Sequence, residues 1–142
     1  MTKDLKIEKL NPEARISVAE GDSPLLNIYP CLENEFLVIP AGTTVAVPTG
    51  LKITPESGYC VLAKETPELA KHGIAVLGGI ITPSSECKLM LSNTTINSVV
   101  LDTRTEVTYK ASGLGTIIIP ASNPIANLLV IPVVAPTIKY SE

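Results

Sequence analysis

Side chains able to perform acid–base, nucleophilic or metal chemistry are few in this sequence and do not gather in motifs. The one histidine, His72, lies in a Lys-His-Gly turn, where a structural role is the simpler interpretation. Glu33 and Glu35 flank a loop without a histidine partner, so no metal site is expected there. The cysteines are odd in number and widely spaced, which predicts buried reduced thiols at Cys31, Cys60 and Cys87. No cofactor is therefore expected.

The elements that would have to position a site are short apolar runs rich in Val, Ile, Leu and Thr, separated by Pro and Gly. This pattern predicts β-strands, with prolines between them where a missing N–H costs no ladder bond. The one helical turn expected is 65–71. Many short strands with close turns predict an all-β barrel or jelly-roll-like sandwich in a single domain, 1–142. The expected strands are 4–10, 25–29, 35–39, 43–47, 50–54, 59–63, 74–77, 87–92, 97–101, 105–110, 116–119, 125–131 and 133–139.

The composition points to an oligomer and away from several classes of partner. The 142 residues are 45% hydrophobic and 18% charged, so we expect further subunits to cover surplus apolar surface. A net charge of −3, the absence of Trp and the lack of a Lys/Arg cluster argue against nucleic-acid binding. No run is long enough to cross a bilayer, and the opening MTKDLKIEKL lacks the apolar stretch of a secretory signal. Neither a membrane partner nor secretion by a signal peptide is expected.

One stretch, Ile39–Ile53, reads IPAGTTVAVPTGLKI and resembles the IPPGxxxxVPTGL segment of trimeric dUTPases. Further matching segments follow in chain order at 59–63, 69–74 and 78–81. The likeness covers two parts of the chain, 5–93 and 116–138. It implies a homotrimer of distorted jelly rolls, or β-clip barrels, with active sites between subunits. It also implies hydrolysis of dUTP to dUMP and pyrophosphate with Mg²⁺ and an aspartate base.

The resemblance breaks down at the positions where that family keeps its chemistry. In the third motif, Ile-Asp-x-Asp-Tyr-Arg-Gly, the general base falls on Thr82 and the second aspartate on Ser84. The ring that packs on the deoxyribose falls on Ser85, and the arginine falls on Glu86. The metal-linked aspartate of the first motif falls on Asn27. A threonine hydroxyl holds its proton too tightly to act as the base at neutral pH.

The remaining motifs are changed in the same direction. The phosphate-gripping Arg-Ser-Gly of the second motif falls on Glu65-Thr66-Pro67, so a cation is replaced by an anion. In the fourth motif the glutamine falls on Asn127, within the run Ser122–Asn127. The Gly-rich fifth motif has no counterpart in the sequence given. Phosphoryl transfer needs cations to absorb charge on the phosphates, so we expect a catalytically degenerate member without dUTPase activity.

A second departure is extra length between the third and fourth motifs, about 96–115. It contains two alternating runs, 98–101 and 105–110, which predict an added β-hairpin. Asp102, Thr103 and Arg104 lie between the runs and are the candidate binding residues. Two interpretations remain open: a lengthened edge of the barrel, or a new contact surface on a rigid scaffold.

These observations favour a non-catalytic homotrimer with a structural role, first of all a decoration or cement protein on a viral, phage-type capsid. The partner would then be a viral coat protein, and the location the virion. The alternative is a regulatory protein-binding module, resembling the dUTPase-like early proteins of adenoviruses and acting in the host cytoplasm. A third and weaker interpretation is residual dUTP binding or pyrophosphatase activity.

Overall fold

The computed structural model describes residues 5–19, 23–83, 85–111, 113 and 115–141. Within them the regular structure is almost entirely strands, with one short helix, which confirms the predicted all-β class. A five-stranded sheet has the order β2 (Ile16–Val18), β3 (Leu26–Ile28), β14 (Ala126–Pro132), β7 (Tyr59–Glu65) and β9 (Ile80–Ile81). A four-stranded sheet has the order β12 (Tyr109–Lys110), β13 (Ile117–Pro120), β11 (Val99–Asp102) and β4 (Phe36–Ile39).

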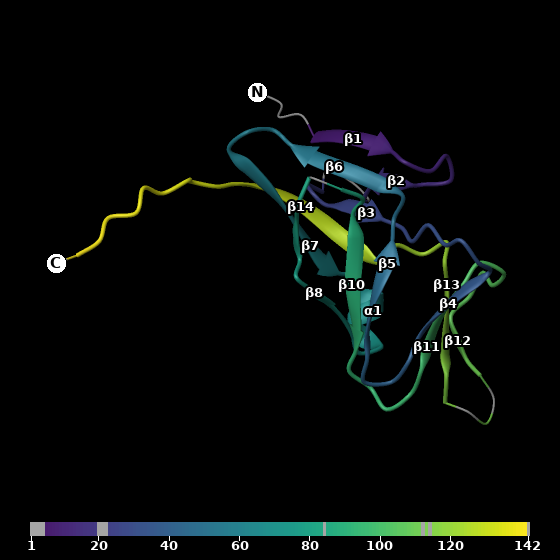
Figure 1. Cartoon of the computed structure of the whole chain (residues 1–142). Helices are drawn as coiled ribbons and strands as arrows, with labels where there is room; N and C mark the ends of the chain where they lie inside the picture. Colours follow the sequence, from purple (N-terminus) through teal and green to yellow (C-terminus); the bar gives the residue numbers. More distant parts are fainter. Residues whose placement is uncertain (1–4, 20–22, 84, 112, 114, 142) are drawn as a thin grey trace.

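Two smaller sheets complete the domain (Figure 1). The first has the order β5 (Thr44–Pro48), β10 (Lys88–Asn93) and β8 (Ile74–Leu77), and the second pairs β1 (Leu5–Lys9) with β6 (Leu51–Pro55). The short helix α1 (Pro67–Lys71) joins β7 to β8. No helix among the described residues has the length and apolar character needed to cross a membrane.

The core lies between the sheets and is built from strand positions that alternate inward. On β7, for example, Val61 and Ala63 are fully buried, whereas Leu62 and Lys64 between them are not. Each sheet therefore contributes one apolar face, as expected for a sandwich of twisted sheets. The largest fully buried side chains include Ile28, Ile39, Leu51, Ile53, Leu91, Leu101, Ile119 and Leu128.

Two glycines, Gly50 and Gly73, lie in turns within the segments that carry the sequence resemblance. Gly50 has a φ of +69°, and a Cβ there would lie 3.0 Å from the Cβ of Ala14. Gly73, which follows α1, has a φ of +75°, and a Cβ would collide with the side chain of Thr95. A side chain at either position would be both strained and obstructed, so these turns need glycine.

Most predicted strands are confirmed within one or two residues, but two expected strands are wrong in whole or in part and two strands were missed. The segment 133–139 forms no strand: the chain leaves the body after β14 (Figure 1). The run 105–110 contributes only β12, and the short strands β2 and β9 were not predicted. A strand needs a neighbour to pair with, and 133–139 has none among the described residues, so its β-pattern alone could not form one.

The predicted hairpin within 96–115 is also wrong. The strands β11 and β12 do not pair with each other; both pair with β13, which lies between them. The pairing of β11 with β13 is parallel, from Val99↔Ile117 to Asp102↔Pro120, and β12 pairs with β13 antiparallel. The other side of β11 pairs with β4. The segment therefore supplies a central strand and an edge strand of the four-stranded sheet.

Candidate functional site

The third-motif positions line a cavity of about 320 Å³ beside β9 and β10. Thr82 and Ser85 are exposed at its rim, and Ser84 lies outside the described residues. Polar and apolar atoms share the lining, and the described rim offers the hydroxyls of Thr82 and Ser85 where the resemblance implies a base and an aromatic ring. The described lining comprises Leu77, Gly78, Ile80, Ile81, Thr82, Ser85, Glu86, Cys87, Lys88, Leu89 and Met90.

Glu86, which stands where the family has an arginine, is bound to the protein's own backbone. Its Oε2 accepts a hydrogen bond from the Gly50 N–H at 3.0 Å. The neighbouring Cys87 is buried, and burial raises the pKa of its thiol to about 11. At neutral pH this thiol is protonated and is not a nucleophile. The pKa of Cys31 is also raised, chiefly by burial.

The second-motif positions have become a strand end and a helix cap. Glu65 Oε2 accepts a hydrogen bond from the Val76 N–H at 3.0 Å, and this bond lowers the pKa of the carboxyl. Lys64 Nζ lies 3.6 Å from Glu65 Oε1. Thr66 is the N-cap of α1, where its Oγ1 accepts from the Leu69 N–H at 3.3 Å. Both side chains therefore stabilise the junction of β7, α1 and β8.

The first and fourth motifs meet across the five-stranded sheet. Asn127 on β14 is paired with Asn27 on β3, and its Nδ2 donates to Asn27 Oδ1 at 2.8 Å. Asn27 Nδ2 lies 3.5 Å from Ser17 Oγ, which itself lies 2.9 Å from the Tyr29 hydroxyl. The structure thus brings Asn27 and Asn127 together as two neutral amides joined by a hydrogen bond.

These residues do not fit the Mg²⁺ that the resemblance implies. Mg²⁺ is usually held by one or two carboxylates, and the metal-linked position carries the amide of Asn27. The oxygen of that amide already accepts a hydrogen bond from Asn127 Nδ2. In the described part of the chain, no three His, Cys, Asp or Glu side chains are grouped so as to hold a metal ion.

A polar contact that the sequence did not indicate joins α1 to the extra segment. The carboxylate of Glu68 accepts a hydrogen bond from Thr108 Oγ1 at 2.6 Å. It also accepts from Asn123 Nδ2, at 3.2 and 3.1 Å. Thr108 belongs to the extra segment and Asn123 to the fourth-motif run, so three distant parts of the sequence meet beside the second-motif position. No spacing rule links these residues, because the contact depends on the order of the four-stranded sheet.

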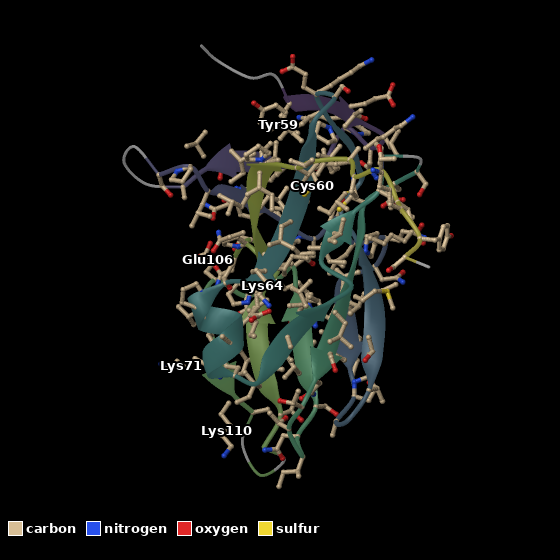
Figure 2. All side chains as sticks on the ribbon, turned by 90° about the vertical axis from the view of Figure 1, so that its left-hand side faces the viewer. Tyr59, Cys60, Lys64, Lys71, Glu106 and Lys110 are labelled. Atoms are coloured by element: carbon tan, nitrogen blue, oxygen red, sulfur yellow. The ribbon has the colours of Figure 1, made fainter. Side chains whose placement is uncertain are left out.

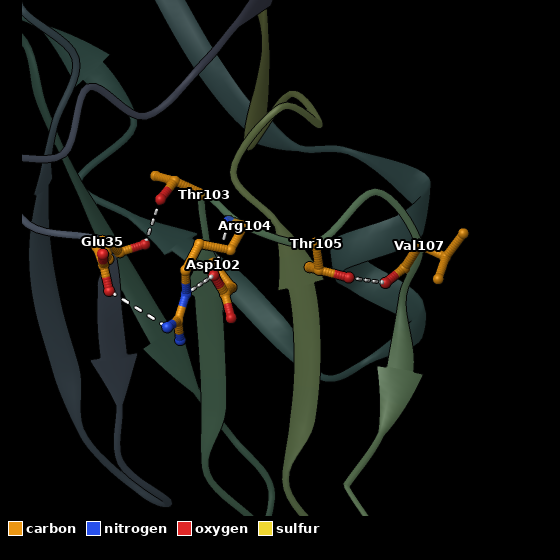
Figure 3. A network of polar contacts seen from close by, with 6 residues as sticks. All are labelled: Glu35, Asp102, Thr103, Arg104, Thr105 and Val107. Atoms are coloured by element: carbon orange, nitrogen blue, oxygen red, sulfur yellow. Dashed lines mark hydrogen bonds and ion pairs between the residues drawn. The ribbon is translucent and has the colours of Figure 1, made fainter.

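The candidate binding residues between the two runs are engaged within the chain (Figure 3). Thr103 donates through both its backbone N–H and its Oγ1 to the Glu35 carbonyl, at 2.8 and 2.7 Å. Asp102 Oδ1 accepts from the Arg104 N–H at 2.8 Å, which lowers the pKa of Asp102. Arg104 reaches Glu35 Oε2 at 3.3 Å and lies over the ring of Phe36. This cluster fastens the end of β11 to the start of β4, and its role as a binding surface stays a prediction.

His72 ends α1 as its C-cap, and its backbone N–H bonds to the carbonyls of the last helical turn. On the outer side of β7, Lys64 is exposed, and Lys71 and Lys110 lie farther along the same side (Figure 2). The resemblance places the phosphate-binding arginine at none of these lysines. These three lysines are exposed.

Comparison with solved structures supports the fold independently of the sequence resemblance. The chain superimposes on a mutant dUTPase from phage phi11 of S. aureus with a TM-score of 0.73 and 14% identity, covering 98% of this chain and 97% of that one. It matches the dUTPase of Staphylococcus bacteriophage 80alpha with dUpNHpp at a TM-score of 0.75 and 15% identity, covering 99% and 89%. The EIAV dUTPase matches at 0.67 and 16%, covering 98% and 97%.

No family model and no curated protein sequence matches the chain. The structural matches, at well under 25% identity, establish the fold: this chain has the dUTPase-like, all-β jelly-roll architecture that the sequence resemblance predicted. One of the matched structures concerns the coordination of a structural Mg(II) ion in the phi11 enzyme. Others describe phage dUTPases that control transfer of virulence genes.

Proposed function

We propose that this protein is a non-catalytic homotrimer with the dUTPase-like fold, acting through contacts with other proteins. The observation that carries the proposal is that two carboxylates at motif positions are hydrogen-bonded to the protein's own backbone. Glu65 and Glu86 replace the cations of the resemblance, and each accepts a hydrogen bond from a backbone amide of another segment. These side chains serve the scaffold, and they place negative charge where a nucleotide's phosphates would have to sit.

The chemistry of hydrolysis supports the same conclusion. Attack of water on a phosphoanhydride needs a group that takes the proton and cations that absorb phosphate charge. Thr82 cannot take the proton at neutral pH, and Asn27 offers a neutral amide where the metal-linked carboxylate would be. Residual dUTP binding in the 320 Å³ cavity is the weaker candidate, because Ser85 supplies no ring to pack on the sugar.

Within this class we favour a structural role as a decoration or cement protein on a phage-type capsid, with a viral coat protein as partner. The apolar composition suits a subunit whose surface is covered in an assembly. A trimer matches local threefold positions of an icosahedral lattice, and symmetric docking multiplies weak contacts. Matches to dUTPases of phages are consistent with a phage source for the scaffold.

The second candidate is a regulatory protein-binding module. One observation favours it: the phage dUTPases with this fold include proteins described as controlling transfer of virulence genes, and one studied for its SaPI-inducing capacity. On this scaffold the extra segment 96–115 contributes two strands and the Glu68 contact, so it presents a surface that the frame positions firmly.

Purification from the native source under mild conditions, followed by mass spectrometry, separates the two roles. A cement protein is expected to travel with an abundant coat protein at near-lattice stoichiometry. A regulator is expected to come with a scarce partner at a ratio near one to one. Isolation of the protein with neither kind of partner would contradict both roles, and co-purification of bound dUTP or dUMP would favour the nucleotide-binding alternative.

A further inference from the structure

The strand β4 lies at the free edge of the four-stranded sheet, where its backbone can pair with another chain. It pairs with β11 on one side, and among the described residues no strand pairs with its other side. An edge strand of this kind presents unpaired N–H and C=O groups, to which an extended segment can add as a further strand.

The hydrogen bonds between β4 and β11 show which backbone groups of β4 are open. In an antiparallel pair, only alternate residues bond to the neighbouring strand. The Thr103 N–H donates to the Glu35 carbonyl at 2.8 Å, in the same register that continues along β4. Glu35 and Leu37 therefore turn their backbone groups toward β11, whereas Phe36 and Val38 turn theirs toward the free edge.

The other side of β11 agrees with this assignment. The Ala121 N–H donates to the Asp102 carbonyl at 2.8 Å, so the even-numbered residues of β11 bond to β13. The odd-numbered residues, and Thr103 after them, are left for β4. Within the described part of the chain, no backbone hydrogen bond outside this ladder reaches either open residue of β4.

β4 lacks the features that protect other strand edges of this molecule. β12 has only two residues, one of them Lys110, and the Val76 N–H on β8 is bonded to the Glu65 carboxylate. β4 reads FLVI, without Lys or Pro, and the side chains of Phe36 and Val38 are 48% and 41% exposed. Natural proteins usually blunt such an edge, so an open one marks a place where another chain pairs.

The surface beside the edge is apolar. The register places Val38 beside Val100, and Val100 beside Ile118, so one apolar row crosses three strands and ends at the open edge. A side chain of an added strand would extend this row. A cavity of about 190 Å³ lies next to β4, and its lining comprises Leu32, Glu33, Asn34, Phe36, Leu37 and Pro48.

The charges at the start of β4 indicate the kind of partner. Glu33 and Glu35 are both exposed, and among the described residues the cation paired with either of them is Arg104, at 3.3 Å from Glu35 Oε2. The sequence from 29 to 49 contains no Lys or Arg. Pairing of β4 with β4 of a second copy would therefore bring no cation to these acids, whereas a basic segment of another protein would.

The cluster at the end of β11 holds this edge in position (Figure 3). Thr103 donates twice to the Glu35 carbonyl, and Arg104 lies 5.8 Å from the centre of the Phe36 ring. An edge that is already ordered loses less conformational entropy when a strand adds to it. The cluster therefore favours docking at β4 through the position it gives the strand.

We propose that β4 docks an extended segment of a partner protein, which adds antiparallel to the free edge. The segment is apolar where it meets Phe36 and Val38, and it carries Lys or Arg beside Glu33 and Glu35. An antiparallel strand ends where β4 begins, so the basic residues stand at the C-terminal end of the segment. This inference rests on the proposed role in contacts with other proteins, and it names the surface and the partner chemistry for that role.

Amide hydrogen exchange in the full-length wild-type protein tests whether the edge is open. The amides of Phe36 and Val38 should exchange at least about tenfold faster than those of Leu37 and Ile39, because only the latter pair bond within the ladder. Equal protection of all four amides would mean that this chain or a second copy already covers the edge, and would overturn the proposal.

Binding is tested with two synthetic peptides, acetyl-TVTVTVKK-amide and acetyl-TVTVTVEE-amide, titrated into the full-length protein and followed by NMR. The basic peptide should bind with a Kd on the order of 1 mM, shift the amides of 35–39, and bind at least about threefold more tightly than the acidic one. No binding of either peptide up to about 5 mM, or shifts confined to other segments, would overturn the proposal.

Two variants identify the groups that bind. Val38→Pro removes one open N–H without loss of a ladder bond, so it should keep the urea midpoint and weaken the basic peptide at least about tenfold. The matched control Val38→Thr keeps the N–H and should bind within about twofold of wild type. Equal binding by the two variants would overturn edge pairing.

Charge reversal provides a test that leaves β4 itself unchanged, in case Val38→Pro does not fold. Glu33→Lys should reverse the preference between the two peptides, so that the acidic one binds more tightly. An unchanged preference would overturn the assignment of the basic end of the segment to this acid.

A partner recovered from the native source separates this inference from the proposed function. Affinity at least about tenfold lower for Val38→Pro than for Val38→Thr would support docking at β4. Equal affinity for both variants would overturn docking at β4 and leave the role in protein contacts intact. Isolation of the protein with no partner would contradict that role, and with it the inference that rests on it.

Discussion

The motif positions and the C-terminal arm, residues 133–141, differ in whether their side chains have partners within their own chain. At the motif positions, polar side chains form hydrogen bonds within their own chain. Glu65 accepts from the Val76 N–H, Glu86 accepts from the Gly50 N–H, and Asn27 accepts from Asn127. In the described residues, no buried side-chain nitrogen or oxygen lacks a hydrogen-bond partner. The arm is apolar and unpaired beyond its root.

The difference teaches where the protein meets other molecules. A polar group bonded to its own backbone is unavailable to a substrate unless that bond is broken, and breaking it leaves a partly buried amide unsatisfied. An exposed apolar segment has no such cost and gains free energy when covered. The proposed non-catalytic role accordingly expects contacts with other molecules on apolar surfaces that the fold leaves open.

The largest effect is expected at Asn93, the buried residue that follows the third-motif region. Its Nδ2 donates to the carbonyls of Ile39 and Asn97 at 3.0 and 2.8 Å, and its Oδ1 accepts from the Thr95 N–H at 3.0 Å. Asn93→Ala should lower the free energy of unfolding by about 2–4 kcal/mol, because buried carbonyls and an amide lose their partner. Urea denaturation measures this.

The matched control is Asn34→Ala, at an exposed asparagine of the loop before β4. It should change the free energy of unfolding by less than about 0.5 kcal/mol. If Asn93→Ala were as mild as Asn34→Ala, the frame around the motifs would not depend on internal hydrogen bonds, and the comparison drawn above would fail.

An intermediate effect is expected at Thr66. Removing the N-cap hydroxyl in Thr66→Ala leaves the Leu69 N–H without its partner and should cost about 1 kcal/mol. Thermal unfolding of Thr66→Ser provides the control, since serine keeps the capping oxygen and should retain most of the stability. A Thr66→Ala protein as stable as wild type would show that the Thr66 hydroxyl does not stabilise the fold.

The pH dependence of stability distinguishes Glu65 from an idle surface acid. The Val76 N–H lowers the pKa of this carboxyl in the folded state. Its contribution is therefore complete above the pKa of the unfolded carboxyl and is lost as the pH falls through the lower, folded pKa. Urea midpoints of wild type and Glu65→Gln should differ at pH 7 and converge toward pH 3.

The exposed acid Glu56 supplies the comparison for that experiment. The midpoints of Glu56→Gln should follow those of wild type across the same range. A gap between wild type and Glu65→Gln that stays constant or widens as the pH falls would mean that the bond to Val76 does not stabilise the charged form.

Sequence reasoning predicted the frame better than the connections within it. The all-β class and most strand positions follow from local alternation and turn residues, which act over a few neighbours, and the match to solved dUTPases agrees with the IPAGTTVAVPTGLKI stretch. The 96–115 segment was misread because alternation identifies a strand but not its partner. The insertion of β13 between β11 and β12 depends on long-range pairing.

The candidate site shows the same division. The motif residues were found from their order in the chain, and the structure places Thr82, Ser85 and Glu86 around one cavity. Their bonds were not predictable, because Glu86 meets Gly50 and Glu65 meets Val76 only after the sheets have formed. Glu68, which joins Thr108 and Asn123, was missed since an acid in the first turn of a helix is ordinary by itself.

The smallest effect on stability is expected in the arm. Tyr140→Ala, measured at a dilution where the protein is monomeric, should change the free energy of unfolding by less than about 0.5 kcal/mol, because the ring is 90% exposed. Fluorescence-detected urea titration at low concentration checks this. A loss comparable to that of Thr66→Ala would mean that the arm packs on its own body in solution.

The most direct test of the central claim is a dUTP turnover assay with Mg²⁺, following pyrophosphate release from purified wild-type protein. The account predicts no release above the uncatalysed rate, because Thr82 stands where the general base would be, and Glu65 and Glu86 stand where phosphate-binding cations would be. Release that scales with protein concentration, persists through repeated purification and falls in Thr82→Ala would contradict it. The protein would then be an enzyme with a different set of groups in the same cavity.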